Sequence, residues 1–154
     1  MIEVREALFE DAFFVASRLR ESDKRELLAA SPDDPERRVL DSWRVSDWCR
    51  VALVDGEPAV LWGVAQCIQM GEQYGSPWLL ATEKITKIRR GFVEKCLEDK
   101  DLVMNSYPKL FNLVHRENLL SQSWLQWMGF VLHKEPTGNN GQFYLFTSQG
   151  FFDV

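Results

Sequence analysis

The sequence contains few of the side chains that bind metal ions or form disulfides. Its 154 residues include three cysteines, at positions 49, 67 and 96, and two histidines, at positions 115 and 133. No two cysteines have CxxC spacing, and the two histidines complete no metal-ligand set at a standard spacing. We therefore expect no metal site, and we interpret the cysteines as reduced, mostly buried thiols of an intracellular protein.

The chain also lacks a long hydrophobic run and an excess of positive charge. No apolar stretch approaches the roughly 20 residues that cross a bilayer, and the segment MIEVREALFEDAF has acids where a signal peptide has cations. The net charge is −5, whereas binding to nucleic acid requires clustered cations that displace counterions from phosphates. We expect a cytoplasmic protein whose partners include neither a membrane nor a nucleic acid.

The composition that remains is that of a folded domain. Hydrophobic residues make up 45% of the chain, and the six Trp and ten Phe indicate a large aromatic core. A chain of this length buries a sizeable core without metals or disulfides. We expect residues 1–154 to form a single domain.

One strand and two helices are predicted before residue 49. The opening IEVREA alternates apolar and polar residues, which is typical of a short strand. Apolar residues at helical spacing predict a helix over residues 9–30, bent or interrupted near residues 21–23. Pro35 occupies a plausible first turn of a second helix, over residues 36–48.

Antiparallel strands are predicted for the middle of the chain. The Asp-Gly pair at 55–56, between two β-branched runs, is the strongest hairpin signal. It predicts strands over residues 49–54 and 58–68. Residues 71–77 are interpreted as a loop, followed by a third strand of the same sheet over residues 78–82.

The remaining pattern mixes helices and strands. We expect a helix over residues 85–100, a strand over 110–115, a helix over 119–128, and strands over 129–133 and 142–147. This order predicts an α+β fold, an α/β sandwich in which a central mixed sheet of about six to seven strands has helices on both faces.

One segment carries a family resemblance. Residues 111–130, FNLVHRENLLSQSWLQWMGF, combine a strand, a polar break at Asn118, a helix and a Gly-Phe pair. With the element order of the whole chain, this combination resembles the GNAT N-acetyltransferase superfamily. The resemblance implies that two parallel strands, near residues 78–83 and 110–115, splay apart. It also implies that the pantetheine arm of acetyl-CoA pairs with their backbone groups, and that its pyrophosphate binds N–H groups at the next helix.

The resemblance names acetyl-CoA as the cofactor and assigns residues to it. These are Ala81, Thr82, Lys87, Arg89, Arg90, Gly91, Phe92 and Asn118. The phosphate loop of the family normally has two small residues, which let the backbone approach phosphate closely. Here residues 89–93 read Arg-Arg-Gly-Phe-Val, with one glycine only. The cations of Lys87, Arg89 and Arg90 could partly substitute for the missing small residue by side-chain contact.

Acyl transfer to an amine requires a base for the amine and an acid for the leaving thiolate. The resemblance places the family's proton-donating tyrosine at Leu125, which donates no proton. Glu83, at the end of the strand near 78–83, is the candidate general base, and His115 is the candidate acid or base. The alternatives are a surface carboxylate for Glu83 and a helix-capping or core-edge group for His115.

The C-terminal third carries a narrower resemblance. The strings NLVHREN, WMGFVLHKE and GQFYLFT are similar to small GNAT-like proteins that podophages encode beside their internal core proteins, with a role in virion assembly. The first hypothesis is therefore a catalytically degenerate acetyltransferase homologue of a bacteriophage, which acts in virion assembly by binding a phage or host protein in the cytoplasm of a bacterial host. The alternative is an active acyl-CoA-dependent N-acetyltransferase with an amine substrate. A third hypothesis, an unrelated α+β binding domain, requires strands that do not splay.

Overall fold

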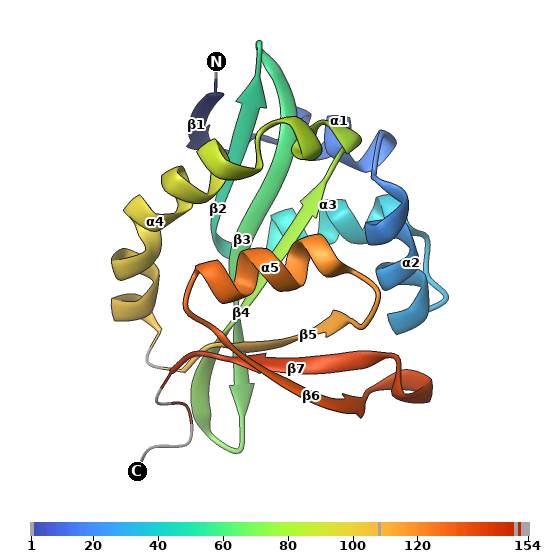
Figure 1. Ribbon diagram of the computed structural model, residues 1–154, viewed down its shortest axis with the longest axis vertical. Helices are drawn as coiled ribbons and strands as arrows, with labels where there is room; N and C mark the ends of the chain where they lie inside the picture. Colours follow the sequence, from blue (N-terminus) through green and yellow to red (C-terminus); the bar gives the residue numbers. More distant parts are fainter. Residues whose placement is uncertain (1, 108, 150, 152–154) are drawn as a thin grey trace.

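The computed structural model describes residues 2–107, 109–149 and 151, which form strands and helices arranged as in Figure 1. The strands are β1 (Ile2–Glu6), β2 (Ser46–Val54), β3 (Glu57–Gln69), β4 (Glu72–Ala81), β5 (Phe111–His115), β6 (Val131–Thr137) and β7 (Phe143–Thr147). The helices are α1 (Phe9–Ser17), α2 (Glu21–Ala30), α3 (Pro35–Val45), α4 (Arg89–Ser106) and α5 (Leu119–Trp127), with two short 3-10 helices, η1 (Glu83–Lys87) and η2 (Asn139–Gly141).

Two antiparallel sheets meet at one point. Strands β1, β2, β3 and β4 form the first sheet in that order, and the second sheet has the order β5–β7–β6. Within the described residues, the two sheets share one isolated parallel bridge, between Gly75 of β4 and Leu110 beside β5. The result is the mixed sheet that the element order predicts, with β4 and β5 splayed apart as the family resemblance implies.

Helices cover both faces of the first sheet (Figure 1). Successive side chains of a strand point to opposite faces. Trp62 of β3 accordingly belongs to a core cluster with Phe92 of α4 and Trp124 of α5. Its neighbour Leu61 belongs to a second cluster with Val39 of α3. The predicted sandwich, with helices on both faces of the sheet, is therefore confirmed.

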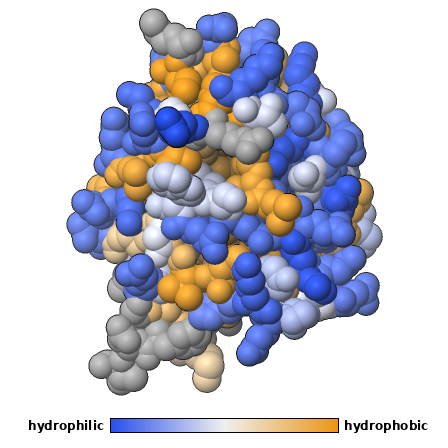
Figure 2. Space-filling model, in the orientation of Figure 1, coloured by the Kyte–Doolittle hydropathy of each residue, from blue (hydrophilic) through white to orange (hydrophobic). Residues whose placement is uncertain are grey.

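On the face shown in Figure 2, hydrophilic side chains dominate, and apolar side chains reach the surface in separate areas between them. None of the helices in the described ranges combines the length and the apolar character needed to cross a membrane.

The first sheet contains a second hairpin that the sequence did not reveal. The predicted turn at 55–56 is present, with φ of 49° at Asp55 and 84° at Gly56. A similar turn occurs at Met70 and Gly71, with φ of 51° and 79°. The predicted loop over residues 71–77 is thus wrong, because most of it is the first half of β4 paired with β3. This half of the strand begins with two exposed polar residues, Glu72 and Gln73, and its sequence EQYGS has no alternating apolar pattern.

Several predicted helix boundaries also shift. The helix over 9–30 is two helices, α1 and α2, separated near Arg20. The helix over 36–48 ends at Val45, because Ser46 and Trp48 pair with β3 and extend β2. The helix over 85–100 begins as the 3-10 turn η1 and continues as α4 to Ser106.

Candidate functional site

Strands β4 and β5 run parallel and separate beyond their bridge. The N–H of Gly75 donates to the Lys109 carbonyl at 2.9 Å, and the side-chain amide of Asn112 donates to the Pro77 carbonyl at 3.0 Å. Beyond Pro77, no ladder pairing joins the two strands in the ranges that the structure describes. Peptide groups of both strands therefore face a gap.

Helix α2 closes one end of this gap. The N–H of Ala81, the last residue of β4, donates to Asp23 Oδ2 at 2.9 Å. The Ala81 carbonyl accepts the N–H of Arg20 at 2.9 Å. On β5, the N–H of His115 donates to Glu26 Oε1 at 2.6 Å. Two carboxylates, Asp23 and Glu26, thus occupy one peptide N–H on each strand.

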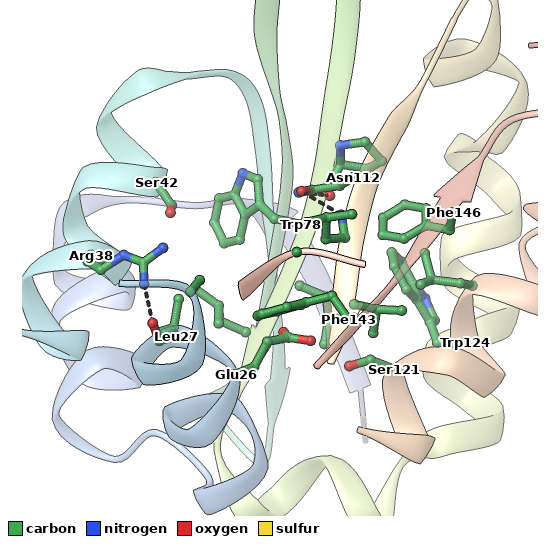
Figure 3. A pocket seen from close by; sticks show the side chains of 18 of the residues that line it. Glu26, Leu27, Arg38, Ser42, Trp78, Asn112, Ser121, Trp124, Phe143 and Phe146 are labelled. Atoms are coloured by element: carbon green, nitrogen blue, oxygen red, sulfur yellow. Dashed lines mark hydrogen bonds between the residues drawn. The ribbon is translucent and has the colours of Figure 1, made fainter. Parts of the chain in front are cut away.

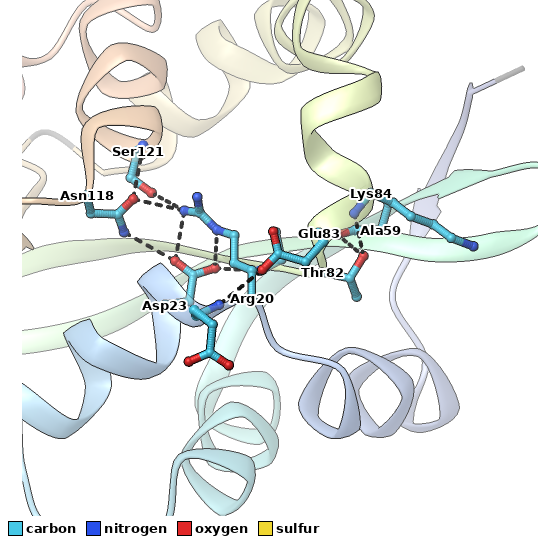
Figure 4. Close-up of polar contacts among 10 residues, drawn as sticks. Arg20, Asp23, Ala59, Thr82, Glu83, Lys84, Asn118 and Ser121 are labelled. Carbon is cyan, nitrogen blue, oxygen red and sulfur yellow. Dashed lines mark hydrogen bonds and ion pairs between the residues drawn. The ribbon is translucent and has the colours of Figure 1, made fainter.

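Arg20 and Asp23 form a buried ion pair at the centre of this closure (Figure 4). Arg20 Nε and Nη2 each lie 2.8 Å from an Asp23 carboxylate oxygen, and the residues are 5% and 0% exposed. Nη2 also donates to Asn118 Oδ1 and Ser121 Oγ at 3.0 Å, and the Asn118 amide donates to Asp23 Oδ1 at 3.2 Å. Burial raises the pKa of Asp23, and the guanidinium opposes that rise. A buried charge pair is tolerated when its hydrogen bonds are satisfied, as they are here.

Three predicted cofactor residues lie in or beside this cluster. The N–H of Ala81 is bonded to Asp23 of α2, and its carbonyl to Arg20, the residue that precedes α2. Asn118 is 1% exposed, and its Oδ1 also accepts the Ser121 N–H at 3.4 Å, which caps α5. Thr82 Oγ1 accepts the Lys84 N–H at 3.3 Å and caps η1. Cofactor binding by these residues stays a prediction.

Gly91 and Phe92 contact the protein core. A Cβ at Gly91 would lie 2.6 Å from Ile2 Cδ1, so the glycine allows α4 to pack closely on β1. The Phe92 ring lies between Trp62, at a centroid distance of 4.9 Å, and Trp124, at 6.3 Å. The bulk of Phe92 therefore fills the core and does not block the loop.

The cationic residues near the start of α4 differ in their surroundings. Lys84 forms an ion pair with Glu57. Lys87 and Arg90 are exposed, and the side chain of Arg89 lies outside the described residues. The first N–H groups of an α-helix have no intrahelical carbonyl, so this end of α4 retains the general chemistry of an anion site.

The two predicted catalytic residues contact different parts of α2. Glu83 is exposed, and its Oε1 accepts the N–H of Glu21 at the start of the helix, at 3.2 Å. His115 is buried, and its Nδ1 accepts the Glu117 N–H at 3.1 Å. Its Nε2 has no hydrogen-bond partner among the described residues, and burial lowers the pKa of His115. Each side chain has a structural role, and a catalytic role for either stays a prediction.

A cavity of about 350 Å³ lies in the gap between β4 and β5 (Figure 3). It extends to α2, α3, α5 and the β6–β7 connection. Its aromatic lining consists of Trp78, Trp124, Phe143 and Phe146, and its polar side chains include Glu26, Arg38, Ser42, Asn112 and Ser121. The cavity is large enough for a small organic molecule.

Glu26 is an acidic side chain that lines this cavity, and it is not among the candidates predicted from the sequence. Burial and the neighbouring charge of Asp23 raise the pKa of Glu26 to about 7, against the hydrogen bonds from His115 and Asn118 and the charge of Arg20. A signal was present, because Asp23, Glu26 and the apolar Leu27 share one face of α2 by their spacing. Acids on the apolar side of a helix indicate buried carboxylates.

No protein-family model and no curated protein sequence matches the chain, whereas many solved structures do. A GNAT-family acetyltransferase from Streptococcus pneumoniae is 17% identical, with a TM-score of 0.61 over 96% of this chain and 98% of that one. PaiA N-acetyltransferase from Thermoplasma acidophilum, solved in complex with coenzyme A, is 18% identical, with a TM-score of 0.59 and the same coverage. Identities this low establish the fold and leave the activity open.

Proposed function

We propose that this chain, which has the fold of the GNAT acetyltransferases, does not use acetyl-CoA and acts by binding another protein. The observation that carries the proposal is the closure of the gap at Ala81 by Arg20 and Asp23. In the family that the sequence resembles, the pantetheine arm pairs with backbone groups in this gap. Here the Asp23 carboxylate and the N–H of Arg20 already occupy the N–H and the carbonyl of Ala81 in that gap.

The residues present do not fit the pantetheine arm. A ligand that paired with Ala81 would have to displace the Asp23 carboxylate and the Arg20 N–H from the backbone. Separating the buried Arg20–Asp23 pair would leave charges without partners, at a cost of about 3–5 kcal/mol. Leu125, where the family has its tyrosine, is buried in the core and supplies no proton.

Exposed apolar side chains support the protein-binding role. Leu8, Phe9 and Phe13, at and near the start of α1, are each at least half exposed. The rings of Phe9 and Phe13 lie 6.3 Å apart, and Phe9 also contacts Trp43 of α3 at 5.9 Å. Clustered exposed hydrophobic residues are typical of protein-protein contacts. The C-terminal resemblance supports a phage or host protein as the partner, and virion assembly as the process.

Calorimetric titration with acetyl-CoA, together with thermal unfolding, tests the closure. We expect no heat of binding and no rise in Tm, because a ligand stabilises a protein only by binding its native state. A saturable rise in Tm that is lost in the Lys87→Ala/Arg90→Ala double variant would show that the groove accepts the cofactor, and it would overturn the proposal.

Co-purification from phage-infected cells tests the binding surface. We expect the Phe9→Ser/Phe13→Ser variant to lose a partner that the unaltered protein retains. Leu119→Ser is a matched control, because Leu119 is 68% exposed on a different helix. Equal recovery of the partner by both variants would remove α1 from the interface.

A second candidate function is N-acetylation of an amine. It is favoured by Glu26, a carboxyl group with a pKa of about 7 at the cavity, because a base is most effective when its pKa is near the working pH. This function would require the Arg20–Asp23 pair to move away from Ala81. Release of free thiol from acetyl-CoA in the presence of amines, lost in Glu26→Gln, would establish it.

A further inference from the structure

The cavity between β4 and β5 has a negative and a positive group on different walls. Glu26 of α2 is half-buried and lines it, with Oε1 held by the N–H of His115. Arg38 of α3 is also half-buried and lines it, and Figure 3 shows the two side chains on different elements around the same space. A cavity with this charge distribution suits a ligand that carries both charges.

Arg38 has capacity for an anionic ligand. Its Nη1 donates to the Leu27 carbonyl, and no carboxylate of the described residues pairs with the guanidinium. Ser42 lies one turn further along α3 and also lines the cavity. A guanidinium and a hydroxyl on one helix face are donors that match a carboxylate.

Backbone acceptors surround the cavity near Glu26. Along β4, the N–H groups of Gly75 and Ala81 point away from β3. Because backbone groups alternate every two residues along a strand, the N–H and the carbonyl of Leu79 point in the same direction. Along β5, Leu113 alternates in the same way with His115, whose N–H meets Glu26. Leu79 and Leu113 both line the cavity. Their carbonyls, together with the carboxylate, are the acceptors that an ammonium group with three donors requires.

Part of the remaining wall is aromatic. Trp124, Phe143 and Phe146 line the cavity from α5 and β7, and in Figure 3 Trp124 and Phe146 lie on the side away from Arg38. A volume of about 350 Å³ equals roughly a dozen water molecules, at about 30 Å³ each. That volume suits a small molecule with one apolar arm.

We propose that this cavity binds a free α-amino acid with an apolar side chain. The ammonium group contacts Glu26 and the neighbouring carbonyls, the carboxylate contacts Arg38, and the side chain lies against Trp124 and Phe146. The proposal goes beyond the protein-binding role and does not depend on it, because neither Ala81 nor the exposed apolar residues of α1 line the cavity. It involves binding alone, with no covalent step.

Calorimetric titration at pH 8 with L-phenylalanine and L-leucine tests the proposal. We expect saturable binding of at least one of them. Two analogues separate the charges: phenethylamine lacks the carboxylate, and 3-phenylpropionate lacks the ammonium group. Each analogue should bind roughly tenfold or more weakly than L-phenylalanine, because one charged hydrogen-bonding partner in the cavity is then left without its match.

Two variants test which residue of the protein binds each charged group of the ligand. Glu26→Gln should weaken L-phenylalanine at least tenfold and leave 3-phenylpropionate unchanged or tighter. Arg38→Met should weaken L-phenylalanine and leave phenethylamine unchanged. Arg37→Met is the matched control, because the Arg37 side chain is 80% exposed beside the same helix turn and does not line the cavity.

Unfolding curves of all three variants establish that they are folded before binding is compared. Absence of binding by both amino acids at millimolar concentration, in protein with an unchanged unfolding transition, would overturn the proposal. Binding that is equally strong in Glu26→Gln and Arg38→Met would overturn it as well, because the ligand would then lie elsewhere.

Discussion

The carboxylate of Asp23 accepts the backbone N–H of Ala81 at 2.9 Å, across 58 residues of sequence. A side chain of α2 thereby satisfies a peptide group at the open end of β4. The same carboxylate forms the ion pair with Arg20, so the closure of the gap and the stability of the fold depend on one group.

Asp23→Asn should strongly destabilise the protein. The neutral amide would leave the buried guanidinium of Arg20 without a countercharge, and removing one partner of a buried pair costs about 3–5 kcal/mol. Urea unfolding measures the loss of free energy. Glu117→Gln is the control, because it breaks an exposed ion pair with Arg25, and exposed pairs contribute about 0–1 kcal/mol. Equal losses in the free energy of unfolding for the two variants would show that the buried pair stabilises the protein no more than an exposed pair does.

Glu26→Gln should change how stability depends on pH. The pKa of Glu26 is raised from 4.5 to about 7 in the folded protein, so ionisation is harder there than in the unfolded chain. Ionisation of Glu26 therefore lowers the free energy of unfolding as pH rises from 4.5 towards 7, and this loss of stability is complete above pH 7. Glutamine cannot ionise, and its carbonyl oxygen still accepts the His115 N–H.

Urea unfolding of both proteins from pH 4 to pH 8 measures this effect. The stability of Glu26→Gln relative to the unaltered protein should rise by up to about 3 kcal/mol across that range. His115 is present in both proteins, so its own effect on stability cancels in the comparison. A difference that stays constant with pH would contradict a raised pKa for Glu26.

The sequence predicts the architecture well, because apolar periodicity reports burial. Trp62 and Phe92 are large, buried and regularly spaced, so the elements that contain them were predicted. The first half of β4 is not predicted, because residues 72–76 pair with β3 through backbone groups and show no alternating apolar pattern. Apolar periodicity in a sequence cannot reveal hydrogen bonds that form without the burial of an apolar side chain.

The site was harder to predict than the fold. The residues that close the gap, Arg20 and Asp23, lie almost 100 positions before Asn118 in the sequence, and nothing local indicates that they meet. The family resemblance drew attention to Glu83 and His115 at strand ends. Glu26 required instead the observation that α2 has an acid on its apolar face.

The two tryptophans of α5 should differ sharply in their contribution to stability. Trp124 is 7% exposed and stacks on Phe92, whereas Trp127 is 68% exposed. Trp124→Ala should cost about 3–5 kcal/mol, because it removes a large side chain from the core. Trp127→Ala should change the free energy of unfolding by less than about 1 kcal/mol. Similar losses in urea unfolding would contradict the placement of α5.

Gly75→Ala should weaken the junction between the two sheets. A Cβ at position 75 would lie 2.5 Å from Leu110 Cδ2 and 2.8 Å from the Tyr107 ring, and Leu110 is completely buried. Overpacking of this kind costs about 1–3 kcal/mol, because the neighbours must shift or leave their preferred rotamers. The Gly75–Leu110 bridge would be strained directly.

Urea unfolding measures that cost, and hydrogen exchange locates it, since the N–H of Gly75 donates to Lys109 across the junction. Gly71→Asn is the matched control. Position 71 has a φ of +79° with open space around it, and Asn tolerates this backbone region better than most residues. If Gly75→Ala is as stable as Gly71→Asn, with unchanged exchange at the junction, the close approach of β4 to Leu110 is wrong. If it is selectively weakened there, the close approach at Gly75 contributes to holding the two sheets together at the point where the gap begins.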